Sequence, residues 1–102
     1  MKIYFAIWLG ETNKFIESLG SNERKKIHAA VVFLEQGDFR SVHVKTLSGV
    51  IKELIVKRYR IIFFVNRGSL YIVSIFMKKT NKTPRAHIEK AERLCKLIIN
   101  NN

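Results

Sequence analysis

Residues 51–77 read IKELIVKRYRIIFFVNRGSLYIVSIFM, and this segment is the strongest indication of the fold class. It holds three runs rich in β-branched and aromatic residues, at 51–56, 59–65 and 70–77, a composition typical of β-strands. Asn66-Arg67-Gly68, between the last two runs, is a turn signal. The stretch therefore predicts three consecutive strands joined by short turns.

Capped helices and one further strand flank this segment in the sequence. Alternating apolar residues predict a strand over Ile3–Leu9, and helical spacing predicts one helix between Thr12 and Gly20 and another between Ser21 and Gly37. Residues 38–49 show no sustained periodicity and predict a loop, and Thr83-Pro84 predicts the start of a last helix.

The sequence thus predicts a single α+β domain over residues 1–102, with the order β-α-α-β-β-β-α. We expect a twisted antiparallel sheet, with an N-terminal helical hairpin and a C-terminal helix packed on it. One face of the sheet should meet the helices, and the other should stay free as a concave working surface.

Positive charge is the unusual feature of the composition. The chain has 19 Lys and Arg against 8 Asp and Glu, a net charge of +11. Residues 51–102 contribute +9 of this charge and residues 1–50 only +2. Such self-repulsion favours a polyanionic partner: nucleic acid first, an acidic protein segment second, an anionic membrane surface third.

The sequence also predicts the compartment. Its one cysteine, Cys95, cannot form an internal disulfide, which fits a reducing environment. No stretch approaches the roughly 20 apolar residues of a membrane helix, and Ile3–Leu9 is too short for a signal peptide. We expect a soluble, cytoplasmic protein without disulfides, membrane contact, metal or cofactor.

Two groups of cations are candidates for an anion site. Arg60 shares one face of its strand with Ile62 and Phe64. It is either a strand-end arginine that reaches water or pairs with Glu53, or a ligand for a phosphoryl group. The second group, KKTNKTPR at 78–85, meets the positive end of the last helix and favours anion binding over a merely solvated turn.

Proton-transfer groups are fewer. His28 should lie on the surface or in packing. His43, in the predicted loop, and His87, in the first turn of the last helix, are each either structural or an acid or base. Glu53 is the only carboxylate of the predicted sheet, and its structural alternative is an ion pair with Arg60 or Lys52.

Several motifs resemble those of one known family. Leu47-Ser48-Gly49, Lys52-Glu53-Leu54 and Tyr59-Arg60-Ile61 are similar to the L-x-G loop, the E-L-R strand and the Y-R-I/V strand of the RelE/ParE superfamily of type II toxins. FMKKTNKTP at 76–84, followed by Ile88-Glu89 and Ala91, resembles the HigB-like, phage-derived branch. The resemblance covers about residues 45–95.

The resemblance implies the toxin of a type II toxin-antitoxin system. Such a toxin is most often a ribosome-dependent mRNA endoribonuclease, in which the 2′-hydroxyl of the RNA attacks the adjacent phosphate. Arg60 matches the arginine thought to stabilise the phosphorane, and fixed positive charge suits that step without a metal. The predicted catalytic residues are Arg60, Lys78, Lys79, Glu53 and His87, and the predicted RNA-binding residues are Lys45, Lys57, Arg58, Lys82 and Arg85.

The chain also departs from the family pattern. Ile55 replaces the arginine of E-L-R, His87 stands where the HigB-like branch usually has an acid, and no Tyr or His ends the chain. The general base is therefore open among Glu53, His43 and a lysine.

Two other functions compete with the nuclease. One is a ParE-like toxin that inhibits DNA gyrase without nuclease activity, and the other is a non-catalytic RNA-binding module. For the toxin, the resemblance implies two partners: mRNA on the ribosome, and a cognate antitoxin, which in this branch is a HigA-like helix-turn-helix protein. We expect an acidic segment of that antitoxin to lie over the basic surface.

Overall fold

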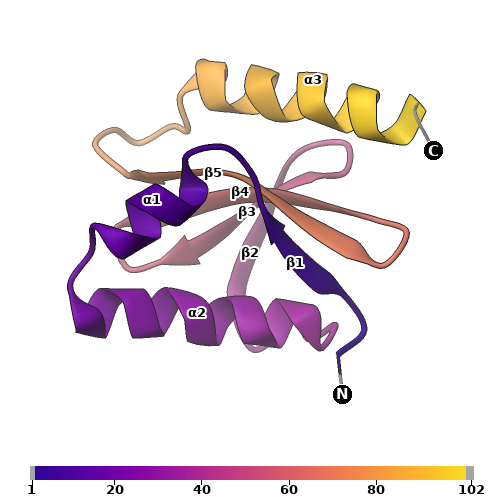
Figure 1. Ribbon diagram of the computed structural model, residues 1–102. Helices are drawn as coiled ribbons and strands as arrows, with labels where there is room; N and C mark the ends of the chain where they lie inside the picture. The colour runs from indigo at the N-terminus through magenta and orange to yellow at the C-terminus, as the bar shows by residue number, and fades with distance from the viewer. Residues whose placement is uncertain (1, 101–102) are drawn as a thin grey trace.

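A computed structural model describes residues 2–100 and has an α+β fold (Figure 1). Five strands and three helices follow one another in the described part of the chain. In order they are β1 (Phe5–Trp8), α1 (Thr12–Glu17), α2 (Ser21–Glu35), β2 (His43–Ser48), β3 (Ile51–Val56), β4 (Tyr59–Asn66), β5 (Ser69–Met77) and α3 (Arg85–Asn100).

The strands form one sheet in the order β1-β5-β4-β3-β2. The three predicted strands of residues 51–77 lie together as an antiparallel meander, as expected. Two details of the predicted sheet are wrong. The predicted loop 38–49 contains β2, which pairs antiparallel with β3, and β1 pairs parallel with β5, so the sheet is mixed. Residues His43–Ser48 form a strand because they pair with β3. Their own hydrophobic periodicity does not predict this pairing.

Helices cover both faces of the sheet, which corrects the expectation of one free face (Figure 1). On one face α1 and α2 pack on a cluster that includes Ile61 and Phe63, both 0% exposed. On the other face α3 packs on Ile62 and Phe64, also 0% exposed. The alternation along β4 therefore sends successive apolar side chains into two separate cores.

A bulge in β5 changes what that strand presents to α3. The register between β4 and β5 shifts between Ile62 and Phe63. Ser74 is paired with Ile62, while Val73 packs in the α3 core, so two successive residues lie on the α3 side. An extra residue of this kind bends the strand and changes the direction of the neighbouring side chains.

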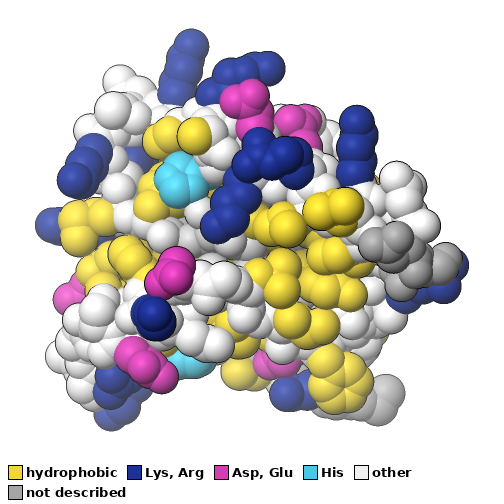
Figure 2. Space-filling model, turned by 45° about the horizontal axis from the view of Figure 1, so that its top comes forward, with side chains coloured by type: hydrophobic (Ala, Val, Ile, Leu, Met, Phe, Trp, Pro, Cys, Tyr) yellow, Lys and Arg dark blue, Asp and Glu magenta, His cyan; other side chains and the backbone are white. Residues whose placement is uncertain are grey.

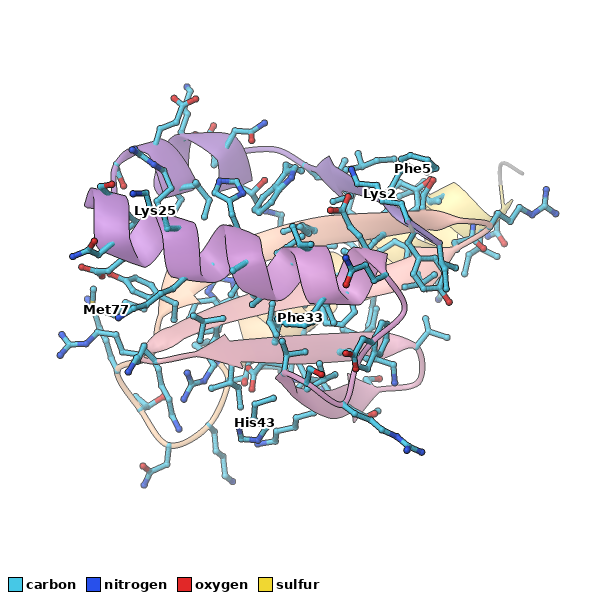
Figure 3. All side chains as sticks on the ribbon, turned by 90° about the horizontal axis from the view of Figure 1, so that it is seen from below. Lys2, Phe5, Lys25, Phe33, His43 and Met77 are labelled. Atoms are coloured by element: carbon cyan, nitrogen blue, oxygen red, sulfur yellow. The ribbon has the colours of Figure 1, made fainter. Side chains whose placement is uncertain are left out.

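The α3 side carries most of the features that bear on function. Figure 2 shows lysine and arginine side chains around this side and hydrophobic ones gathered near its centre. Figure 3 shows Phe5, at the start of β1, and Met77, at the end of β5, at opposite ends of the molecule. The loop 78–84 therefore follows the end of β5 that is opposite to the residues paired with β1. None of the helices among residues 2–100 has the length and apolarity needed to cross a bilayer.

Candidate active site

Two rows of side chains cross the sheet just beyond the start of α3. Strand pairing aligns His43, Ile55, Arg60 and Phe76 in one row over β2, β3, β4 and β5. The next row, one step toward α3, consists of Lys45, Glu53, Ile62 and Ser74. Residues two apart on a strand share a face, so both rows lie on the α3 face of the sheet.

Five residues of these rows line a small polar hollow, which we call the first hollow. Its volume is about 30 Å³, and since one water occupies ~10–15 Å³ on this measure, it has room for two or three oxygen-sized groups. The nonbridging oxygens of one phosphodiester match that size. The first hollow is lined by Lys45, Glu53, Ile55, Arg60, Phe76, Lys78, Asn81 and Thr83.

Backbone carbonyls hold the guanidinium of Arg60. Its Nη1 donates hydrogen bonds to the carbonyl oxygens of Lys57, at 2.9 Å, and Tyr59, at 3.0 Å. A guanidinium has five N–H donors, and those of Nε and Nη2 have no such partner among residues 2–100. The turn between β3 and β4 thus orients the side chain while leaving donors for an anion.

Glu53 is buried, with 2% of its surface exposed. The hydroxyl of Thr83 donates a short hydrogen bond to its carboxylate. The alternative role of Glu53, an ion pair with Arg60 or Lys52, is not found: among residues 2–100 the ion pairs join Lys2 to Glu35 and Lys14 to Glu11. Because Thr83 belongs to the loop before α3, this hydrogen bond ties that loop to the sheet.

A second hollow adjoins the first and shares Phe76 and Lys78 with it. Its volume is about 210 Å³. Apolar side chains make much of its wall, and lysines stand around it. The second hollow is lined by Phe76, Met77, Lys78, Lys79, Thr80, Lys82, Pro84 and His87.

His87 lies in the second hollow. Its Nδ1 is 2.6 Å from the hydroxyl oxygen of Ser74, and its ring stacks on Phe76 with centroids 4.0 Å apart and planes at 11°. Burial lowers the pKa of His87, and the charge of Lys90 lowers it further. The imidazole is therefore neutral at pH 7 and fixed in orientation, as a proton-transfer group requires.

The remaining predicted residues lie around these hollows rather than in them. Lys57 and Arg58 line a separate hollow of about 500 Å³ between the β3–β4 turn and α2, where the Tyr59 hydroxyl donates to Glu23. Arg85 is exposed at the start of α3, and His43 is exposed at the outer end of the first row. The structure thus brings together Lys45, Glu53, Arg60 and Lys78 in the first hollow, and Lys78, Lys79, Lys82 and His87 in the second.

Four residues at the two hollows were not predicted from the sequence as site residues. Thr83, Asn81 and Phe76 line the first hollow, and Ser74 orients His87. All but Ser74 belong to the FMKKTNKTP motif. The motif could therefore have identified these three residues as candidate site residues. Nothing in the sequence marks Ser74, because its contact depends on the bulge in β5.

The most voluminous of these hollows lies elsewhere. Its volume is about 540 Å³, and it lies between α3 and the β2–β3 turn. Glu92 and Ile99 line it on the side of α3. Its side chains include both acids and bases, so it lacks the one-sided charge expected for a polyanion. Among residues 2–100 no group of three or more His, Cys, Asp and Glu is placed to hold a metal ion.

The chain is similar to one sequence family and to several solved structures. Residues 14–96 match the family described as "Phage derived protein Gp49-like (DUF891)". No curated protein sequence matches the chain significantly. Three solved structures share the fold at low identity, two of Escherichia coli toxin RelE and one of an archaeal complex.

Each of the three structures matches over most of its own length. A mutant of E. coli toxin RelE in the free state has 18% identity and a TM-score of 0.64, covering 91% of this chain and 97% of that one. The isolated E. coli RelE toxin has 17% sequence identity and a TM-score of 0.60, and the match covers 89% of this chain and 98% of that one. A chain of the RelB-RelE antitoxin-toxin complex from Methanococcus jannaschii has 13% sequence identity and a TM-score of 0.60. This match covers 70% of this chain and 88% of that one. At these identities the similarity establishes the fold.

Proposed function

From the premise that the chain belongs to the phage-derived Gp49-like family, which is RelE-like, we propose that it is the toxin of a type II toxin-antitoxin pair. Its activity is that of a ribosome-dependent mRNA endoribonuclease that works without a metal. The resemblance to the RelE superfamily is confirmed, and the HigB-like branch stays a prediction. One observation carries the nuclease proposal: Arg60, Lys45 and Lys78 line one hollow of about 30 Å³.

The proposed reaction is attack by the 2′-oxygen on the adjacent phosphorus. The bond to the 5′-oxygen breaks, leaving a 2′,3′-cyclic phosphate and a 5′-hydroxyl. The phosphorane between these states carries more negative charge than the diester, so fixed cations lower its energy. Arg60 supplies a forked donor held by two carbonyls, and Lys78 supplies a second charge. The message held by the ribosome supplies the in-line geometry.

Acid–base assignments follow from position. Glu53 is the carboxylate within the first hollow, where it would accept the proton of the 2′-hydroxyl. His87 lies in the adjoining second hollow next to Phe76, where the minor fraction of its imidazole that is protonated at pH 7 would donate a proton to the departing 5′-oxygen. Two groups in separate environments suit an acid and a base that act at once.

Arg60→Ala tests the proposal. Loss of a preorganised donor for developing charge costs about 10²–10³ in rate, so induction of the variant should no longer arrest growth or cleave message on purified ribosomes. Arg67→Ala is the matched control, because Arg67 lies in the turn at the other end of β4. An Arg60→Ala protein that cleaves as fast as wild type would refute the assignment.

Gyrase provides the second arm of the test. Wild-type protein that inhibits DNA supercoiling and leaves ribosome-bound message intact would replace the nuclease with the ParE-like alternative. Protein that binds single-stranded RNA, with affinity falling about 0.7 log units per log unit of salt for each phosphate neutralised, but forms no cyclic phosphate end, would leave an RNA-binding module.

We also propose a HigA-like antitoxin as partner, with an acidic segment over the basic loop 78–84. The charge of +11 and the similarity to a toxin from an antitoxin-toxin complex support this partner. Co-expression of the neighbouring small reading frame should restore growth and yield a complex that salt weakens. Growth arrest that no neighbouring frame relieves would count against it.

A further inference from the structure

His87 contacts the sheet through two residues of β5. Its Nδ1 lies 2.6 Å from the hydroxyl oxygen of Ser74, and its ring stacks on Phe76 with centroids 4.0 Å apart. Stacking fixes the plane of the imidazole but not which of its edges faces the sheet, because the ring is able to turn within that plane. The contact with Ser74 therefore decides which ring nitrogen faces the sheet and which one remains for a ligand.

The direction of this hydrogen bond follows from the surroundings of Ser74. The residue is 5% exposed, and among residues 2–100 its hydroxyl has no hydrogen-bond partner other than Nδ1 of His87. A buried hydroxyl without an acceptor destabilises the fold, and in a neutral imidazole one nitrogen accepts while the other carries the proton. The hydroxyl of Ser74 therefore donates to Nδ1, and Nε2 carries the ring proton.

The proton on Nε2 is free for a ligand. Nε2 has no hydrogen-bond partner among the described residues. It is also not one of the buried, unpartnered side-chain atoms of this part of the chain, which are Oγ1 of Thr12 and Nδ2 of Asn66. Nε2 is therefore accessible to solvent, and His87 lines the second hollow together with three lysines.

The bulge in β5 brings the hydroxyl to the imidazole. Val73 packs in the α3 core and Ser74 is paired with Ile62, so two successive residues lie on the α3 side. In a regular strand only one of two successive residues would face that side. The bulge thus allows β5 to present an apolar side chain to the core and a hydroxyl to His87.

We propose that Ser74 is a positioning residue, whose hydroxyl holds the imidazole of His87 with its Nε2 proton available to an oxygen of the phosphodiester bound in the first hollow. The proposal rests on the proposed function, because that function supplies the phosphodiester. His87 stacks on Phe76, which lines both hollows, so this donor lies beside the first hollow. A neutral imidazole donates the hydrogen bond at pH 7 without first taking up a proton.

The same contact serves the protonated imidazole. A serine hydroxyl is able to donate or to accept, so it turns and accepts once Nδ1 of His87 also carries a proton. When the bond between phosphorus and the 5′-oxygen breaks, the Nε2 proton passes to that oxygen and the Nδ1 proton stays on the ring, bonded to Ser74. The hydrogen bond therefore keeps Nε2 at the hollow in both protonation states.

Nitrogen NMR tests the arrangement without relying on cleavage. In protein that contains isotope-labelled histidine, long-range proton–nitrogen correlations identify the ring nitrogen that carries the proton. At about pH 8, above the ordinary histidine pKa of about 6.5, His87 should carry its proton on Nε2, with Nδ1 as an acceptor. A proton on Nδ1 would overturn the proposal, because the hydroxyl of Ser74 would then accept and Nε2 would have no proton to donate.

Ser74→Ala and Ser74→Thr separate the role of the hydroxyl from packing. Ser74→Ala should move the Nδ1 resonance of His87 toward that of an imidazole without a hydrogen bond. Since an ordinary hydrogen bond corresponds to a factor of roughly ten or less, it should also slow cleavage of ribosome-bound message by up to about tenfold. Ser74→Thr keeps a hydroxyl and should restore both. Ser69→Ala, at the other end of β5, is the matched control and should change neither.

The outcomes distinguish this role from the nuclease itself. An Nδ1 resonance that Ser74→Ala leaves unchanged, or a folded Ser74→Thr protein that cleaves as slowly as Ser74→Ala, would overturn the positioning role. Should Ser74→Thr fail to fold, the wild-type spectrum still decides. Wild-type protein that cleaves message with the proton on Nδ1 would retain the proposed function and lose the role of Ser74. Wild-type protein with the proton on Nε2 that cleaves no message would refute the proposed function, and the phosphodiester as ligand with it.

Discussion

The two faces of the sheet use the same strands for different purposes. On the face toward α1 and α2, the positions of β4 are Tyr59, Ile61 and Phe63, all no more than 4% exposed. On the face toward α3, Ile62 and Phe64 are equally buried, but Arg60 is not. The difference lies in the helices, because α3 begins only at Arg85 and leaves the end of its face uncovered.

This comparison explains how a sheet tolerates a cluster of cations. A charged side chain buried under a helix would lose its hydration at a cost of several kcal/mol. At the uncovered end of the α3 face, the cations remain accessible to water or a ligand, while the two buried cores beneath the helices stabilise the fold. The two candidate hollows therefore lie at the end of the α3 face that α3 does not cover.

Replacing Phe63 with alanine should have the largest effect on stability. Truncation of a buried phenylalanine costs about 3–5 kcal/mol, which lowers the melting temperature of a domain of this size by roughly 12 °C or more. Arg60→Ala, one face away, should change the free energy of unfolding by less than about 0.5 kcal/mol. Chemical denaturation of both variants measures the contrast, and equal losses would contradict the division between the two faces.

Much of this division was predictable from the sequence. The alternation in residues 59–65 places Arg60 with Ile62 and Phe64, and the structure has that arrangement. The placement of helices was not predictable, because the spacing in α3 fixes which of its sides is apolar but not which face of the sheet it meets. Likewise His43–Ser48 becomes a strand only through pairing with β3.

The candidate site was predictable in residue type and not in grouping. The motif at 76–84 brought attention to Lys78, Lys79 and Lys82, but their division between two hollows depends on the path of the loop. That path is held by the hydrogen bond from Thr83 to Glu53, residues 30 apart in the chain. No local pattern encodes a contact of that separation.

Thr83→Val should have the second largest effect. Valine keeps the shape of threonine and removes the donor to a buried carboxylate, and leaving such a group without its partner costs about 1–3 kcal/mol. Thr80→Val is the matched control, since its hydroxyl donates to the carbonyl of Lys82 within the exposed loop. Thermal unfolding compares the two, and a control that falls as far as Thr83→Val would show that the tie to the sheet is not what stabilises the loop.

Lys57→Gly and Arg67→Gly form a smaller, matched pair at the two ends of β4. Lys57 has φ +57° and Arg67 φ +50°, a region that favours glycine. Relief of this strain, less the entropy that glycine adds to the unfolded chain, should stabilise each variant by no more than about 1 kcal/mol.

RNA binding should separate this pair. If Lys57 binds a phosphate, its loss should reduce the slope of log affinity against log salt by about 0.7. Arg67, at the other end of the strand, should leave the slope unchanged. Titrations of a single-stranded oligonucleotide at several salt concentrations give both slopes, and an equal reduction in both variants would mean that charge alone, not position, governs binding.

The smallest effect should come from the protonation of His87, because its ring is only partly buried on the α3 face. Burial lowers the pKa of His87 in the folded protein, whereas in the unfolded chain the pKa is near 6.5. Below that value the unfolded chain takes up a proton that the folded protein does not, so stability falls as pH falls from about 7 until the lowered pKa is passed. His87→Gln removes this titration, so wild type should lose stability relative to the variant over that pH range in chemical denaturation. If the free energies of unfolding of wild type and variant fell in parallel with pH, the His87 imidazole would have the same pKa in the folded and the unfolded protein. The conclusion that this imidazole is neutral at pH 7 would then lose its support.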